Sequence, residues 1–222
     1  MGETSKCITD IKVHGKDAYW VQIYVDGEPA FTLPVEEAIH LQRGQQLHPE
    51  EFARLNALAQ YYQAKERAMT YLARRPRSVA EVRRYLREKG FAPEIIERVL
   101  QRLQILDYVN DRDFAAFWVE QREAFRPRGV RALRYELRQK GIDDEIIDEA
   151  VRDVDEITSA RRALRTRTSR WRTLDWPVFR QKATAFLVRR GFTYDVIRDV
   201  VREAWQELHQ TPPEEDVDEE VG

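Results

Sequence analysis

The feature that most constrains this chain is a 26-residue internal repeat, which occurs three times without a gap inside it. Residues 75–100 match residues 126–151 at an offset of 51, and residues 176–201 follow at a further offset of 50. Each copy keeps a proline, a leucine, a glycine and a pair of branched apolar residues, namely Pro76, Pro127 and Pro177; Leu86, Leu137 and Leu187; Gly90, Gly141 and Gly191; and Ile95-Ile96, Ile146-Ile147 and Val196-Ile197. A register kept this well predicts tandem units that each contact mainly their neighbours.

One copy reads as a helix, a glycine turn and a second helix. Ser78 and Glu81 have capping-box spacing ahead of the first helix, and Gly129 takes the place of Ser78 in the second copy. A basic residue and then a glycine end that helix, as a left-handed C′ position favours. A further helix precedes each pair, and the sequence places these at residues 53–74, 114–125 and 158–171. Each unit is therefore predicted to hold three helices.

The start of the chain reads as β structure. Residues 8–14, 18–25 and 28–33 predict three short strands, with a turn at Gly15–Asp17 and an Asp26-Gly27 hairpin. Pro29 places the third strand at an edge. A short helix is then expected from Pro34 to near Arg43, and a long helix from Glu50 to Arg75.

The predicted fold is mainly α, with three tandem three-helix repeats in an elongated curved array and a small N-terminal three-strand element. We expect the β-rich element and short helix in residues 1–48 and the three repeats in residues 49–110, 111–156 and 157–210. Residues 211–222 are expected to form a disordered acidic tail whose role stays open.

The net charge of −2 conceals strong patterning. Residues 61–110 carry 11 basic and 6 acidic side chains, residues 161–210 carry 12 and 5, and the last twelve residues carry six acidic and no basic ones. Clustered arginine is typical of surfaces that contact polyanions, although a solvated helix face is the simpler alternative. Arg131, Arg134 and Arg138 are spaced to share one helix face. The candidate contact residues are Arg74, Arg75, Arg77, Arg83, Arg84, Arg87, Lys89, Arg122, Arg126, Arg128, Arg131, Arg134, Arg138, Lys140, Arg161, Arg162 and Arg165.

No constellation of catalytic residues is found, so we expect neither an enzyme nor a cofactor or metal site. Phosphate-binding glycine loops are absent, the four histidines are scattered, and Cys7 is the single cysteine. Asn110-Asp111-Arg112-Asp113 precedes a helical run and is interpreted as a helix cap. The second helix of each repeat starts with acidic residues, which argues against base reading by a helix-turn-helix. Without an 18-residue apolar run or a signal peptide, a cytoplasmic protein is expected.

The stretch from Ala68 to Val154 resembles the RecX regulatory proteins of bacteria. The matching segments are Ala68–Leu72, Ser78–Leu86, Lys89-Gly90, Leu106–Ala115, Arg122 and Gly129–Gly141, and the hairpin through DGEPAFTL is similar to the N-terminal extension of some members. Asp107 stands where the family usually has glycine, the third repeat is divergent, and the acidic tail is outside the pattern. The resemblance implies binding to the RecA recombinase filament, inhibition of its strand exchange, ATPase and co-protease functions, and no catalytic residues.

The sequence therefore predicts a monomeric regulator whose arginine faces contact RecA and DNA phosphate, either single- or double-stranded, without sequence specificity. Replacing Arg131, Arg134 and Arg138 by Glu is expected to abolish inhibition without unfolding the chain. The alternative is a general DNA-binding repeat protein that acts by competing for nucleic acid, and its binding should weaken steeply with salt.

Overall fold

The protein is described by a computed structural model that covers residues 5–14 and 19–209. The chain divides into two compact units, Met1–Phe114 and Ala115–Gly222, and each is treated by itself. The turn predicted at Gly15–Asp17 and the tail at residues 211–222 lie outside the described residues. In the part of the chain that is described, no helix combines the length and the apolar character needed to cross a bilayer.

The first unit begins with a small antiparallel sheet. Its strands β1 (Lys6–His14), β2 (Trp20–Val25), β3 (Glu28–Pro34) and β4 (Gln46–Leu47) lie in the order β3-β2-β1-β4. The three predicted strands are confirmed, and Pro29 lies in an edge strand, where its missing N–H costs no ladder bond. Asp26 and Gly27 both adopt positive φ, 53° and 89°, as a two-residue turn of the predicted hairpin requires.

The short helix is shorter than predicted. Helix α1 spans Val35–Ala38 and stops well before Arg43. The reason is that the following residues are drawn back to the sheet, where Gly44 donates its N–H to the Ile8 carbonyl and the Ile8 N–H reaches the Gln45 carbonyl. The two-residue strand β4 that results was not predicted, because a strand this short has no periodic pattern.

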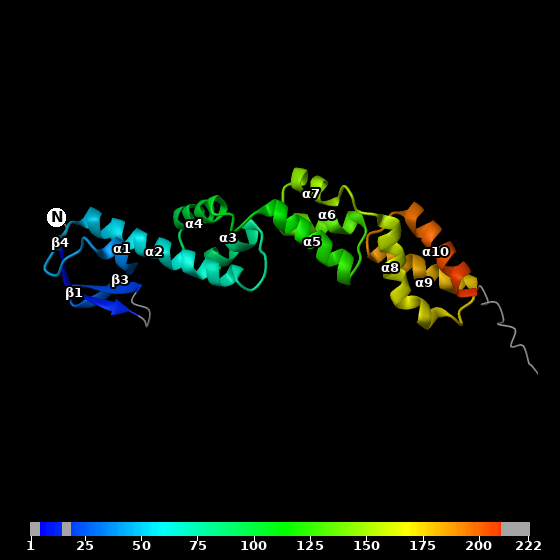
Figure 1. The fold of residues 1–222 in the computed structure, drawn as a ribbon, viewed down its shortest axis with the longest axis horizontal. Coiled ribbons are helices and arrows are strands. Elements are labelled where there is room, and N and C mark those ends of the chain that lie inside the picture. Colours follow the sequence, from blue (N-terminus) through cyan, green and yellow to red (C-terminus); the bar gives the residue numbers. More distant parts are fainter. Residues whose placement is uncertain (1–4, 15–18, 210–222) are drawn as a thin grey trace, which may run out of the picture. The chain divides into compact units, whose positions relative to one another are not determined.

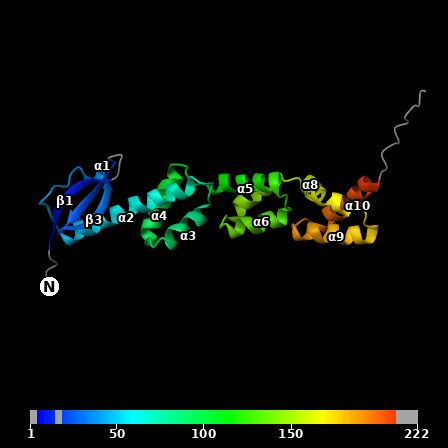
Figure 2. The same ribbon diagram turned by 90° about the horizontal axis from the view of Figure 1, so that it is seen from below.

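The rest of the first unit is the first helical repeat, formed by α2 (Pro49–Leu72), α3 (Val79–Glu88) and α4 (Pro93–Ile105). The apolar face of the sheet packs on the N-terminal part of α2, and α3 and α4 pack against its C-terminal part (Figures 1 and 2). Ala64 and Ala68 are fully buried in α2 and let Val82, Leu86 and Leu103 approach its backbone. The capping box of Ser78 and Glu81 is confirmed in both directions.

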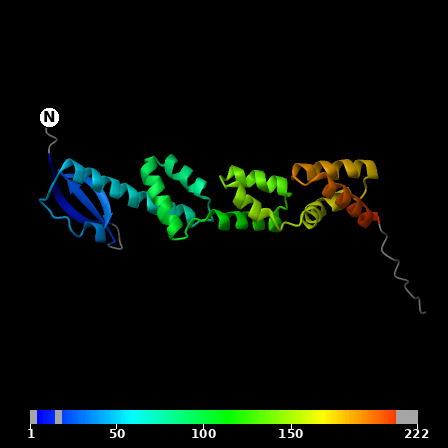
Figure 3. The same cartoon turned by 90° about the horizontal axis from the view of Figure 1, so that it is seen from above.

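The helix α5 (Asp111–Phe125) starts the second repeat, which continues with α6 (Val130–Gln139) and α7 (Asp144–Val151). The third repeat consists of α8 (Glu156–Thr168), the short 3-10 helix Ser169–Trp171, α9 (Trp176–Arg189) and α10 (Tyr194–His209), which pack together in Figure 3. The predicted succession of three-helix repeats is thus confirmed. The cap before α5 is also confirmed, because Asn110 Oδ1 accepts hydrogen bonds from the N–H groups of Arg112 and Asp113.

The first helix of the second and of the third repeat caps the second helix of the preceding repeat, a contact that the sequence did not predict. Asp111, the first residue of α5, accepts a 2.9 Å hydrogen bond from the N–H of Val79, the first residue of α3. Glu156, the first residue of α8, accepts a 2.8 Å bond from the N–H of Val130, the first residue of α6. In each case a carboxylate at one helix start caps another helix start, where the dipole favours negative charge.

The backbone conformation of Asp107 explains why aspartate is tolerated where the RecX pattern usually has glycine. Its φ is 56°, in the left-handed region after α4, where glycine has no steric cost. Aspartate is one of the few other residues that enter this region, because its short side chain can hydrogen-bond locally. Here Asp107 Oδ1 accepts a 3.2 Å bond from the Asn110 side-chain amide.

The second and third repeats meet through a glycine–glycine contact inside the second unit. The Gly129 N–H donates to the Arg190 carbonyl at 3.0 Å. A Cβ at Gly129 would lie 2.3 Å from the Gly191 carbonyl oxygen, and a Cβ at Gly191 would lie 2.5 Å from the Cβ of Ala132. Both glycines are therefore needed for the close approach, whereas the equivalent Gly90 has open space around it.

Gly90→Ala and Gly191→Ala form a matched pair that tests this contact. Both glycines have positive φ, 85° and 81°, so both variants carry a left-handed alanine that costs about 1–2 kcal/mol. Only Gly191→Ala adds overpacking against Ala132, worth about 1–3 kcal/mol more. Urea unfolding should therefore show a larger loss in the free energy of unfolding for Gly191→Ala than for Gly90→Ala. Equal losses would contradict the close packing of the two repeats.

Candidate functional site

Arginines on one helix of a repeat pair with carboxylates on the next helix. Arg83 of α3 holds Glu97 of α4 through two bonds of 2.7 and 3.0 Å. Arg134 of α6 pairs with Asp148 of α7 at the same repeat position, 51 residues later. Arg138 pairs with Asp144 at 2.7 Å, also between α6 and α7. Three acidic residues of α4 and α7 thus bind the protein's own arginines.

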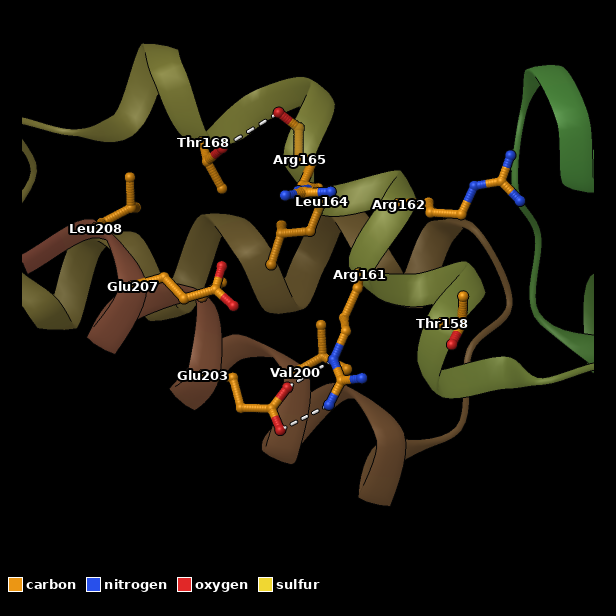
Figure 4. Close-up of a pocket in the computed structure, with 11 residues that line it drawn as sticks. Thr158, Arg161, Arg162, Leu164, Arg165, Thr168, Val200, Glu203, Glu207 and Leu208 are labelled. Carbon is orange, nitrogen blue, oxygen red and sulfur yellow. Dashed lines mark hydrogen bonds and ion pairs between the residues drawn. The ribbon is translucent and has the colours of Figure 1, made fainter. Parts of the chain in front are cut away.

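A fourth interhelical pair lies in the groove between α8 and α10, where Arg161 binds Glu203 through two bonds of 2.8 Å (Figure 4). Hydrogen bonding from Arg161 holds the pKa of Glu203 below its ordinary value, and Arg83 lowers the pKa of Glu97 in the same way. The groove has a volume of about 480 Å³, and Glu207 also lines it, so its charge is mixed. Arg162 points away from both glutamates (Figure 4).

Two further carboxylates are less exposed and hold arginines near the repeat prolines. Glu81 is buried and binds Arg75 at 3.1 Å. Glu136 is half-buried, accepts bonds from Arg122 Nε at 2.6 Å and Trp118 Nε1 at 2.9 Å, and lies 3.5 Å from Arg128 Nε. Within the described residues, at least seven of the seventeen predicted contact residues are thus in internal ion pairs: Arg75, Arg83, Arg122, Arg128, Arg134, Arg138 and Arg161.

The three arginines predicted to share one face, Arg131, Arg134 and Arg138, therefore differ in whether their charge is paired. Arg134 and Arg138 lie against α7, while Arg131 is exposed at a groove of about 510 Å³ between α6 and the α9–α10 turn. Tyr135 and Tyr194 also line this groove and are 64% and 70% exposed. Of the three arginines, Arg131 is the one whose charge faces solvent without an ion pair among the described residues.

The basic residue before each repeat glycine lies over an aromatic ring. Lys89 lies 5.5 Å from the Tyr85 ring centroid, Lys140 4.9 Å from that of Trp118, and Arg190 4.7 Å from that of Phe186. In the first repeat the arrangement continues, because Tyr85 stacks on Tyr71 at 4.1 Å and Arg77 lies 3.9 Å from Tyr71 on its ring. The sequence predicted a helix-dipole role at these positions and placed Lys89 and Lys140 among the candidate contact residues, and the rings fix where the cations lie.

One group of arginines gathers at the junction of the second and third repeats. It consists of Arg126 and Arg128 before α6, Arg167 near the end of α8, and Arg190 after α9. Burial, followed by the charges of Arg128, Arg167 and Arg126, lowers the pKa of Arg190 below its ordinary value. Sequence reasoning missed Arg167 and Arg190 as site residues, since only the fold brings α8, α9 and the α5–α6 connection together.

No group of three or more histidine, cysteine, aspartate or glutamate side chains that could hold a metal ion occurs within residues 5–14 and 19–209. Cys7 is half-buried, and its backbone pairs with Gln46.

Comparison with known proteins identifies the fold and the family. Three family models match in succession: the first three-helix domain of RecX over residues 64–103, the second over 110–151 and the third over 154–201. The chain belongs to the RecX family. The resemblance stated from the sequence is thus confirmed, as are the mainly α class, the three tandem three-helix repeats and the small N-terminal sheet.

The relatives are named as regulatory proteins. The regulatory protein RecX of Prosthecochloris aestuarii is 39% identical over 142 residues, which cover 63% of this chain and 92% of the relative. RecX of Bacillus subtilis is 30% identical over 195 residues, 86% of this chain and 74% of the relative. A crystal structure of regulatory protein RecX superposes with a TM-score of 0.70 over 88% of this chain and 98% of that one, at 24% identity, and RecX from Lactobacillus salivarius gives 0.59 over 65% and 96%.

Glu136→Gln should destabilise the protein more than Glu97→Gln. Glu136 is half-buried and is shared by Arg122, Arg128 and Trp118, so its loss should cost about 1.5–3 kcal/mol of the free energy of unfolding. Glu97 is largely exposed and has one arginine partner, so its loss should cost less than about 1 kcal/mol. Urea unfolding of both variants provides the comparison. Equal losses would show that Glu136 does not organise the arginines around it.

Proposed function

We propose that this protein binds the RecA recombinase and its nucleoprotein filament and inhibits its strand-exchange, ATPase and co-protease activities. The observation that carries the proposal is the succession of three RecX domains across residues 64–201. The protein acts in the cytoplasm as a monomer, without a cofactor, in the regulation of DNA repair, recombination and the SOS response. No step requires catalysis by this chain.

The arginines support a contact with polyanions and acidic protein surfaces. Those without a carboxylate partner are directly available, and Arg131 is an example. In the exposed pairs, such as Arg134 with Asp148, the protein's own carboxylate already occupies the guanidinium group, so these arginines contribute less to the contact than the unpaired ones. The repeats thereby present guanidinium groups to DNA and RecA together, and the bound regulator blocks filament growth or changes the filament state.

The direct test is the single-strand-dependent ATPase of preformed RecA filaments, titrated with this protein in excess DNA. We expect inhibition at well below one regulator per RecA subunit, because a bound regulator affects neighbouring subunits. The alternative function, competition for DNA by a general binding protein, predicts inhibition only at DNA-saturating amounts and recovery when more DNA is added. No inhibition at any ratio would contradict the proposal.

Arg131→Gln should raise the concentration for half-maximal inhibition several-fold. The structure favours this variant over reversal of Arg131, Arg134 and Arg138 to Glu, because two of the new glutamates would face Asp148 and Asp144 and disturb the packing of α6 on α7. Arg54→Gln, on α2 outside the candidate residues, is the control for loss of one exposed charge. Equal inhibition by Arg131→Gln and Arg54→Gln would remove Arg131 from the contact surface.

A further inference from the structure

We propose that Arg126, Arg128, Arg167 and Arg190 form a phosphate-binding site at the junction of the second and third repeats, which holds a backbone phosphate of a nucleic-acid strand. The inference deepens the proposed function by naming one DNA contact, and it rests on that function only for its biological setting. The site lies wholly within the second unit and can be tested without RecA.

Hydrogen bonds between the two repeats bring two of these guanidinium groups together, those of Arg128 and Arg190. Arg190 Nη1 donates at 2.9 Å to the carbonyl of Pro127, the residue between Arg126 and Arg128. In return Arg128 Nη1 donates at 3.4 Å to the carbonyl of Arg189, the residue before Arg190. The connection before α6 and the end of α9 are thus tied to each other, next to the Gly129–Gly191 contact that holds the two repeats in close approach.

A shared aromatic ring adds a third guanidinium, that of Arg167, and Arg126 comes from the same connection as Arg128, just before α6. The guanidinium carbon of Arg190 lies 4.7 Å from the centroid of Phe186, and that of Arg167 lies 5.4 Å from the same centroid. Trp171 in turn packs edge-on against Phe186, with the centroids 6.2 Å apart. Arg167 comes from α8 and Arg190 from the end of α9, so one ring contacts cations from two helices.

The charge of the cluster is not balanced within the described part of the chain. Among the four arginines, the one ion pair is that of Arg128 with Glu136, at 3.5 Å, and Glu136 also binds Arg122 at the shorter distance of 2.6 Å. Moreover, this same Arg128 Nε is buried, and its 3.5 Å contact with Glu136 does not form a hydrogen bond. Like charges placed together around a buried, unsatisfied donor are expected where an anion completes the site.

The arrangement fits a phosphate better than a carboxylate. The four guanidinium groups come from three separate elements, namely the α5–α6 connection, α8 and the end of α9. A phosphate group offers oxygen acceptors in several directions, whereas a carboxylate offers two oxygens in one plane, which suit a single arginine fork. The groove beside Arg161 is a weaker candidate, because Glu203 and Glu207 already supply its anions.

The test measures binding of a fluorescent 20-nucleotide oligo-dT to the full chain by anisotropy, in low salt and without RecA. Arg167→Gln is the main variant, because the Arg167 side chain contacts the Phe186 ring and makes no backbone hydrogen bond that holds the junction. Arg180→Gln, on α9, is the matched control for loss of one exposed arginine. We expect Arg167→Gln to weaken binding at least five-fold and Arg180→Gln less than two-fold. Equal small losses would overturn the proposal.

Arg190→Lys and Arg190→Gln separate charge from structure. Arg190→Lys keeps the charge but loses the planar fork, and Arg190→Gln loses both, so affinity should fall in the order wild type, Arg190→Lys, Arg190→Gln. Circular dichroism and urea unfolding identify any variant whose loss comes from the broken bond to Pro127. Unchanged affinity in both folded variants would contradict the site.

Two competitors identify the ligand. Inorganic phosphate should displace the oligonucleotide at millimolar concentration from the wild-type protein and have less effect on Arg167→Gln, whereas displacement of both alike would indicate general screening and overturn the site. Poly-glutamate that competes as well as an unlabelled oligonucleotide would show an acidic-protein site instead. RecA inhibition is measured separately. If a variant loses oligonucleotide binding but still inhibits RecA fully, the proposed function stands and the site is not needed for it. If the protein binds the oligonucleotide at this site but does not inhibit RecA, the site stands and the proposed function is contradicted.

Discussion

The ion pair between an arginine of one helix and a carboxylate of the next determines how much of this protein's charge is available to a partner. It occurs at equivalent positions in the first two repeats, as Arg83 with Glu97 and Arg134 with Asp148. Each exposed pair adds less than about 1 kcal/mol to stability, and burial of residues such as Leu86 and Leu137 supplies the main packing energy. The principal effect of the pairs is therefore on function, because they set which cations remain for phosphate or acidic protein.

The same ion pairs divide the arginines of the protein into two classes, paired and unpaired. Where the third helix of a repeat supplies an acid, as in the first two repeats, the arginine of the second helix is held against its own repeat. Where two repeats meet at Gly129 and Gly191, the backbones approach closely, and the arginines around Pro127 and Phe186 have Glu136 as their one ion-pair partner in the described chain. The family's three-domain repeat thus gives a surface on which unpaired charge is concentrated at a junction.

Much of the fold could be predicted from the sequence, because the repeat carries local signals. The Ser78–Glu81 capping box, the left-handed Gly90, Gly141 and Gly191, and the Asp26-Gly27 hairpin all depend on residues close in the chain, and all are confirmed. The strand β4 and the caps from Asp111 and Glu156 depend on long-range backbone contacts and were not predicted. The candidate site was predicted by residue type only. Which arginines are paired depends on the packing of the next helix, and Arg167 and Arg190 join Arg128 only through the contact between repeats.

The most direct test of this account is the salt dependence of oligo-dT binding by the wild-type protein. The slope of log association constant against log salt concentration is about −0.7 for each phosphate neutralised on a single strand. If binding depends on the four junction arginines, the slope should be close to −3. If all seventeen predicted residues contacted phosphate, it would approach about −12. A slope steeper than about −7 would show that the internally paired arginines are recruited to DNA and would contradict the account.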